Sequence, residues 1–173
     1  CGYPAGALSI LPCTNEVAAP LIDDPRVRMV TFTGSARVGW AIRQRAFTKR
    51  VTLELGGNAA VLVEPDADLD HAVSRCVSGG YLYAGQSCIS TQRILVHESL
   101  YEAFTDRLVA AVGALRTGDP MEESTAVGPM IDAANAARAV EWIAEAVSAG
   151  ARLAVGGARD GAVLQPTVLL GTT

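Results

Sequence analysis

The order of apolar and polar residues divides the chain into alternating strands and helices. Residues 26–34 alternate and end at a glycine, which is typical of a strand, whereas 35–47 repeat their apolar residues at helical spacing behind Ser35. The elements predicted in chain order are a strand at 7–12, a helix at 14–23 capped by Thr14 or Asn15, a β-rich run at 26–34, a helix at 35–47, strands at 51–55 and 59–63, a helix at 67–83, a strand at 93–97, helices at 98–116 and 132–149, and β-structure over 151–157 and 162–171. Strands that alternate with helices predict an α/β fold with a largely parallel sheet.

Three of the predicted helices carry an apolar face, which we expect to pack into the core. The residues on these faces are Leu69, Ala72, Val73, Cys76, Val77 and Gly80 in the first, Leu100, Phe104, Leu108, Ala111, Val112 and Leu115 in the second, and Val140, Ile143, Ala144 and Val147 in the third.

The composition is that of a folded domain or of a piece of a larger protein. The chain has 173 residues, 50% of them hydrophobic and 18% charged, which is enough for a core. The net charge of -4 and the absence of a basic run argue against nucleic acid or an anionic membrane as partner. Because the sequence shows no long apolar stretch and no signal-peptide pattern, we expect a cytoplasmic protein. Since the first Met is Met29, we also expect a fragment of a longer chain.

Four cysteines, Cys1, Cys13, Cys76 and Cys88, are widely spaced and never form a CxxC pair. This spacing suggests free thiols and neither a disulfide scaffold nor a metal site. Cys76 belongs to an apolar helix face and is interpreted as core filler. Cys88 differs, because "LYAGQSCISTQR" surrounds it with small and polar residues that leave room for a substrate and favour a thiolate. Taken alone, this stretch leaves both filler and nucleophile open.

A glycine turn lies where the β-rich run meets the next helix. In "FTGSARVG", Gly34 and Gly39 form GxxxxG, and Ser35 stands at the helix start. Such a turn points backbone N–H groups and the positive helix end at a phosphate. The turn lacks the Lys-Ser/Thr of a P-loop and is not GxGxxG, so it is either a nucleotide site or a helix start that needs small residues.

Glu54 interrupts the strand-forming run "VTLELGGNAAVLV" and is followed by Gly56 and Gly57. If Val51 and Leu53 face one side, Glu54 faces the other, where a carboxylate could act as general base or simply meet solvent.

Together, FTGS, ELGG and GQSC, in this order and with 34 positions from Glu54 to Cys88, resemble the NAD(P)-dependent aldehyde dehydrogenase superfamily. Further similar segments are "PDADLDHAV", "QRILVHESLYEAF", "VGPMID" and "VLQPTVL". The resemblance implies that the chain is about the middle third of such an enzyme: residues 1–55 end a Rossmann-type NAD(P)-binding domain, and 56–173 begin an α/β catalytic domain.

The resemblance also implies roles. Cys88 would be the nucleophile that forms a thiohemiacetal and then a thioester, and Glu54 would activate the hydrolytic water. Gly34, Ser35 and Gly39 would lie at the cofactor phosphates, and Leu55 and Gly56 on the nicotinamide side. The family's oxyanion Asn, ribose-binding Lys and later ribose-binding Glu have no counterpart in this segment. The cofactor would be NAD or NADP, and the substrate a small, polar or phosphorylated aldehyde. The full-length protein would be a homo-oligomer, a dimer or tetramer.

Two other functions remain open. A cysteine hydrolase or acyl transferase needs a base for the thiol, and only His71 and His97 are present. The second alternative is a folded module without catalytic activity of its own, because catalysis needs residues outside this segment.

Overall fold

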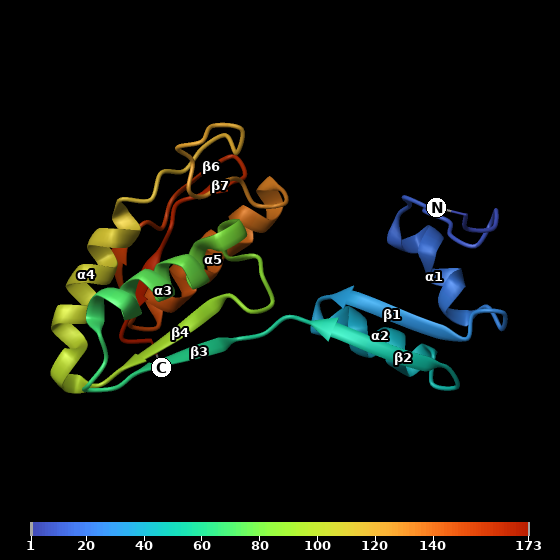
Figure 1. Cartoon of the computed structure of the whole chain (residues 1–173), viewed down its shortest axis with the longest axis horizontal. Helices are drawn as coiled ribbons and strands as arrows, with labels where there is room; N and C mark the ends of the chain where they lie inside the picture. Colours follow the sequence, from blue (N-terminus) through green and yellow to red (C-terminus); the bar gives the residue numbers. More distant parts are fainter. Residues whose placement is uncertain (1, 173) are drawn as a thin grey trace. The chain divides into compact units, whose positions relative to one another are not determined.

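The chain forms two compact units in a computed structural model that describes residues 2–172 (Figure 1). Unit 1 comprises residues 1–56 and unit 2 residues 57–173. The domain boundary expected from the sequence lay one residue earlier, between 55 and 56. Cys1, one of the four cysteines expected above to be free thiols, lies outside the described residues.

Unit 1 is a pair of parallel strands with two helices. Its elements are α1 (Asn15–Asp23), β1 (Met29–Gly34), α2 (Ala36–Arg45) and β2 (Arg50–Leu55). Strands β1 and β2 pair in register from Met29↔Arg50 to Gly34↔Leu55. Ser35 caps α2 as predicted, since its Oγ accepts a hydrogen bond from the N–H of Val38 at 3.4 Å. Gly39 and Ile42 are the buried residues of this helix.

The strand predicted at 7–12 is wrong, because this segment has no regular structure. Leu8, Ile10 and Leu11 are all more than 70% exposed. A strand needs a neighbour for its N–H and C=O groups. Among the described residues, the two strands of unit 1 pair with each other and not with segment 7–12. Apolar alternation alone does not supply a pairing partner.

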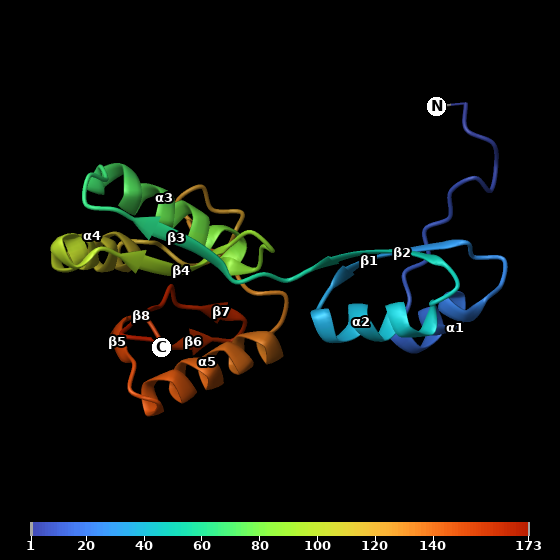
Figure 2. The same cartoon turned by 90° about the horizontal axis from the view of Figure 1, so that it is seen from below.

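Unit 2 contains the remaining elements. They are β3 (Ala59–Val63), α3 (Leu69–Tyr81), η1 (Leu82–Gly85), β4 (Thr91–Val96), η2 (Glu98–Leu100), α4 (Tyr101–Gly113), α5 (Ala133–Ser148), β5 (Arg152–Val155), β6 (Arg159–Asp160), β7 (Val163–Leu164) and β8 (Val168–Leu170). Strands β3 and β4 pair in parallel and are connected through α3 (Figure 2). The helix predicted over 67–83 ends at Tyr81, and a separate turn begins there.

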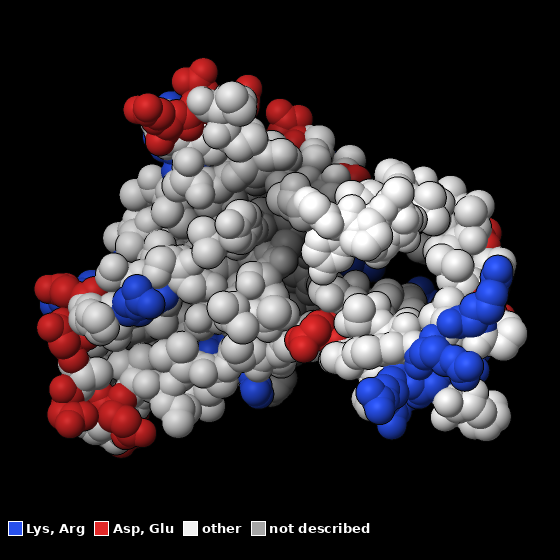
Figure 3. Space-filling view, turned by 45° about the vertical axis from the view of Figure 1, so that its right-hand side comes forward, with Lys and Arg blue, Asp and Glu red and all other residues white. Residues whose placement is uncertain are grey.

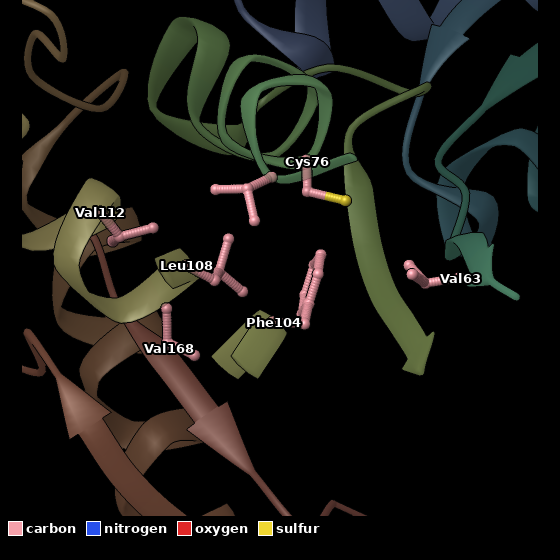
Figure 4. Packing of buried hydrophobic residues seen from close by; sticks show 7 residues of the cluster. Val63, Cys76, Phe104, Leu108, Val112 and Val168 are labelled. Atoms are coloured by element: carbon pink, nitrogen blue, oxygen red, sulfur yellow. The ribbon is translucent and has the colours of Figure 1, made fainter. Parts of the chain in front are cut away.

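The core of unit 2 lies where α3 and α4 meet the strands (Figure 4). Phe104 and Val112 of α4 are the largest fully buried side chains. They pack in one cluster with Val73 and Cys76 of α3 and Val63 of β3. The faces predicted for these two helices are therefore confirmed, and the burial of such a face supplies most of the stability of a helix this short.

The end of the chain departs from the largely parallel sheet that was predicted. Strand β5 pairs with β8, and β6 with β7, and both pairs are antiparallel. Strands β6 and β7 are joined by a tight turn, and β5 and β8 flank this hairpin, so neither pair needs the crossover that parallel strands require. The face predicted for α5 is also partly wrong: Ala144 and Val147 are exposed, whereas Ala136 is fully buried.

One face of the β3–β4 pair is uncovered within unit 2. Leu62 and Leu95 are directly opposite in the register, and they are 68% and 51% exposed. Beside this pair, a hollow of about 910 Å³ separates β4 from β8, and each of these strands is paired along one edge only. Among the described helices, none combines the length and the apolar character needed to cross a bilayer.

We expect the isolated 173-residue chain to self-associate, because an open strand edge and an apolar sheet face are both adhesive. Its mass by sedimentation should exceed 18.0 kDa and rise with concentration. Leu62→Lys with Leu95→Lys should lower that mass, since charge on this face opposes contact. Met121→Lys, at an exposed loop position, is the matched control. A concentration-independent monomer would contradict this prediction.

Candidate active site

The ends of β1 and β2 form a place suited to an anionic group. Gly34 and Leu55 are partners in the register, and both are the last residues of parallel strands. Helix α2 starts immediately after Gly34, and its first turn holds no acidic residue. Ligands of parallel sheets bind at the carboxyl ends of strands, and a helix N-terminus offers free N–H groups. The local geometry of Gly34 and Ser35, both exposed, therefore fits a phosphate.

Gly39 has a different setting from Gly34. It lies within α2, and its N–H donates to the Ser35 carbonyl at 2.9 Å. A Cβ at this position would be 2.5 Å from Cδ2 of Leu55 and 3.5 Å from Cδ2 of Leu53. Gly39 thus lets the helix approach β2 closely, and its own N–H is already used by the helix.

The charged residues are distributed unequally between the two units. Residues 1–56 hold seven basic and four acidic residues, whereas 57–173 hold seven basic and fourteen acidic residues. Basic side chains gather on unit 1 (Figure 3). Arg43 and Arg45 lie in the last turn of α2, where cations are favoured by the helix dipole, and Arg50 begins β2. Much of the cluster is therefore at the opposite end of the strands from Gly34.

Glu54 lies on β2 opposite Thr33. The strand alternates as predicted: Val51, Leu53 and Leu55 are half-buried, whereas Thr52 and Glu54 are exposed. The Glu54 carboxylate is therefore open to solvent on the face away from α2, where it could accept a proton from water.

Cys88 lies in a tight turn between η1 and β4. The N–H of Ser90 donates to the Ser87 carbonyl at 3.0 Å, which closes a turn with Cys88 and Ile89 at its corners. The thiol is free and exposed. Within the described part of the chain, no acceptor bonds to the N–H of Cys88. An exposed thiol next to an unused N–H can add to a carbonyl carbon while the N–H binds the oxygen.

Sequence reasoning did not single out two residues that shape this turn. The hydroxyl of Ser90, only 2% exposed, donates to the Gly80 carbonyl at 3.1 Å and ties the start of β4 to the end of α3. A Cβ at Gly57 would lie 2.8 Å from the Cys88 carbonyl oxygen. The second glycine of the ELGG motif was a visible signal for Gly57, because glycine often marks a close backbone approach.

The helix end beneath the turn is firmly held. Tyr81 donates its hydroxyl to the Thr167 carbonyl at 2.8 Å, and burial raises its pKa to about 12, so the donor proton is retained. A Cβ at Gly79 would lie 2.7 Å from Oγ1 of Thr91. Two glycines at the end of α3 thus allow β4 to begin against the helix.

The other cysteines and the histidines are placed differently. Cys76 is buried in the core, and burial raises the pKa of its thiol, as suits a filler. Cys13 is exposed like Cys88, so exposure alone does not separate these two. The ring of His97 lies 2.9 Å from the Ser99 hydroxyl and caps η2, and His71 is exposed in the first turn of α3. Neither histidine is hydrogen-bonded to Cys88 in the described residues.

Two further features lie apart from Cys88. The hollow between β4 and β8 is lined by residues such as Ile94, Phe104 and Val168, and Cys88 does not line it. Residues 2–172 contain no cluster of three or more His, Cys, Asp or Glu able to hold a metal ion.

Comparison with known proteins gives a consistent result along the chain. A sequence model of the aldehyde dehydrogenase family matches residues 1–173. The 3-sulfolactaldehyde dehydrogenase of Priestia aryabhattai is 46% identical over 169 residues, which are 97% of this chain and 35% of that protein. The vanillin dehydrogenase of an Amycolatopsis species is 42% identical over 172 residues, 98% of this chain and 35% of that protein.

Solved structures show the same likeness. Glyceraldehyde-3-phosphate dehydrogenase of Methanocaldococcus jannaschii, complexed with NADP, superposes with a TM-score of 0.86 at 39% identity, over 88% of this chain and 34% of that one. An NAD-dependent aldehyde dehydrogenase of Sinorhizobium meliloti gives 0.88 at 39% identity, over 92% and 33%. The chain thus spans about a third of the length of the curated relatives it matches.

Gly57→Ala should shift the Cys88 turn, because the new methyl group would collide with a backbone atom that has no side-chain freedom. We expect a several-fold change in the rate of Cys88 alkylation by iodoacetamide, measured by peptide mapping with the exposed Cys13 as internal reference. Gly56→Ala is the matched control, since no atom lies within 4 Å of a Cβ there. Equal rates in the two variants would show that the close approach does not hold the turn.

Proposed function

This chain belongs to the aldehyde dehydrogenase family, and from that premise we propose that the whole protein oxidises an aldehyde to a carboxylic acid with NAD or NADP. The observation that carries the proposal is the exposed thiol of Cys88, whose own backbone N–H bonds to no acceptor among the described residues. A sulfur nucleophile turns a planar carbonyl carbon into a tetrahedral one that can release hydride. It then leaves an acyl group that water can remove.

The proposed reaction begins on Cys88. Its thiolate forms a C–S bond with the aldehyde carbon, and the oxygen becomes an oxyanion that the N–H of Cys88 stabilises. The nicotinamide cofactor, when bound, supplies the acceptor for the hydride that leaves this carbon. The C–S bond remains as a thioester. Glu54 then takes a proton from water, the hydroxyl adds to the thioester carbon, and the C–S bond breaks to give the carboxylic acid and free Cys88.

We assign cofactor binding to unit 1. Gly34 and Ser35 would hold a phosphate at the start of α2, while Leu55 and Gly56 would line the nicotinamide side. Gly39 would contribute by keeping α2 close to Leu55, as its packing indicates. In this proposal residues 1–55 end the NAD(P)-binding domain and 56–173 begin the catalytic domain. The two similar structures described above are named with NADP and with NAD, so both cofactors stay in the proposal.

A small, polar or anionic aldehyde is the proposed substrate class. The names of two similar proteins, for 3-sulfolactaldehyde and for glyceraldehyde 3-phosphate, support it. Vanillin dehydrogenase, named for an aromatic aldehyde, is the contrasting relative. We further propose a homo-oligomer, a dimer or tetramer, in the cytoplasm, without nucleic acid or membrane as partner. The net charge of -4 over the whole chain favours neither of these polyanionic partners.

Cys88→Ser in the whole protein tests the proposal. Aldehyde-dependent NAD(P)H formation should fall by ~10³-fold or more, because hydroxyl is a far weaker nucleophile than thiolate. Substrates of the three kinds, sulfonated, phosphorylated and aromatic, should be compared by kcat/KM. Retained activity in Cys88→Ser would overturn the proposal, as would hydrolysis of esters without any aldehyde oxidation.

Glu54→Gln in the whole protein should slow thioester hydrolysis more than hydride transfer. Losing one positioned general base costs ~10²–10⁴-fold in the step that it serves. Stopped-flow mixing should then show a burst of reduced cofactor and a slow steady state. Thr52→Ser, a change on the same exposed face of β2, is the control. If both phases match the unchanged protein, Glu54 is only a strand residue.

The 173-residue chain alone should oxidise aldehydes poorly, which keeps the silent module as a real alternative for this segment. A missing oxyanion donor costs ~10²–10³-fold in rate, and the proposed cofactor site holds no ribose contact. NAD(P)H formation and cofactor binding by calorimetry, compared between this chain and the whole protein, measure this. Equal turnover by both would show that these 173 residues contain the complete site.

A further inference from the structure

A strained backbone turn precedes Cys88. Tyr83 and Ala84 have φ angles of 52° and 55°, and Gly85 follows with 74°. The left-handed region is natural for glycine but costly for residues with a Cβ, and such strain persists only where the surroundings hold it. Gly85 has no Cβ and adopts this conformation without strain, whereas Tyr83 and Ala84 are strained in it. The turn must therefore be held by bonds from other groups.

The side chain of Gln86 supplies these bonds at both ends of its amide. Its Nε2 donates to the Tyr83 carbonyl at 3.1 Å, in addition to the backbone N–H of Gln86, which donates to the same oxygen at 3.1 Å. Its Oε1 accepts from the N–H of Ile131 at 3.0 Å. One amide thus closes the strained turn and ties it to a segment 45 residues later in the chain.

The segment that Gln86 grips is itself anchored. Met130 donates its N–H to the Ala162 carbonyl at 2.8 Å, and Asp132 caps α5 by accepting from the Asn135 N–H at 2.7 Å. Ile131 lies between these two fixed points. The Gln86 amide therefore connects the turn to a backbone segment that is hydrogen-bonded on both sides of Ile131.

Cys88 lies midway between two such attachments. Gln86 fixes the chain two residues before it, and Ser90 fixes it two residues after through the Gly80 carbonyl. Within the described residues the thiol itself makes no hydrogen bond, so its position depends on its neighbours. A nucleophile displaced by about 1 Å can lose ~10²-fold in rate.

We propose that Gln86 is a positioning residue for Cys88: its amide holds the left-handed turn 83–85 closed and fixes it to the Ile131 backbone. The proposal rests on the function proposed above, in which Cys88 is the nucleophile. Gln86 touches neither substrate nor cofactor in this scheme. Its removal lowers the fraction of time that Cys88 spends in the productive position, which affects kcat and leaves cofactor binding in unit 1 unchanged.

The test uses the whole protein with Gln86→Met, which keeps the length of the side chain and removes both amide bonds. We expect kcat per Cys88 titrated by iodoacetamide to fall ~10–100-fold, with the KM for the nicotinamide cofactor unchanged. Adding Ala84→Gly to Gln86→Met should raise kcat again by roughly tenfold. Glycine adopts the left-handed conformation without strain, so the turn no longer needs the Gln86 hydrogen bonds to stay closed. Gln44→Met, on the exposed surface of α2, is the matched control.

The rescue separates positioning from stability. If Gln86 only stabilises the fold, the number of titratable sites falls while kcat per site is kept, and that result overturns the proposal. A loss of kcat that Ala84→Gly does not restore also overturns it. Should Gln86→Met fail to fold, Gln86→Glu keeps the acceptor for the Ile131 N–H and must give an intermediate kcat at the pH plateau. Full activity in Cys88→Ser would instead reject the proposed function, whatever Gln86 does.

Discussion

The parallel pairing of β3 with β4 is the constraint on which the Cys88 turn depends. The register joins Ala59 to Thr91, so the segments that lead into the two strands arrive at the same edge. Gly57 and Cys88 are in those two segments, and Gly57 approaches the Cys88 carbonyl closely enough that a Cβ would collide with it. Strand pairing therefore brings the Cys88 carbonyl into backbone contact with Gly57, and the flanking side chains then hold the turn that carries the thiol.

Helix α3 makes this pairing compatible with an open thiol. Its apolar face enters the core through Val73 and Cys76, and its end carries Gly79 and Gly80, which let Thr91 lie against it. Ser90 is buried there, and a buried hydroxyl is costly unless it is bonded. Its bond to Gly80 removes that cost and holds the chain on the far side of Cys88. The Ser90 side chain is thus hydrogen-bonded inside the core, while Cys88 in the same turn stays exposed.

The sequence predicted what depends on local pattern and missed what depends on pairing. Helix faces of α3 and α4 and the cap at Ser35 were correct, because period and cap chemistry are local properties. The strand at 7–12 was wrong because alternation says nothing about a partner. The antiparallel strand pairs near the end were missed for the same reason.

The residues of the candidate site likewise fall into those that the sequence pattern reveals and those that only the fold reveals. Cys88 and Glu54 were visible as unlike their neighbours. That Gly34 and Leu55 lie side by side comes from the strand register. Gly57 was visible in the ELGG motif, but its close approach to Cys88, 31 positions later, is a property of the fold. The same holds for the hydrogen bond from Ser90 to the Gly80 carbonyl. Gln86 stood in the quoted stretch, yet its two hydrogen bonds involve a backbone conformation and a partner, Ile131, that composition does not reveal.

Both candidate sites follow one structural rule, since each lies where paired parallel strands begin or end. In unit 1 the strands stop together at Gly34 and Leu55, and a helix start meets the opening. In unit 2 the strands start together after Gly57 and Cys88. Backbone groups at strand ends are released from the ladder, so they can bind a phosphate or an oxyanion. Releasing them also removes the hydrogen bonds that would fix the chain there. Side chains such as Ser90 and Gln86 replace those bonds, which is why polar residues flank a thiol that has to remain unbonded itself.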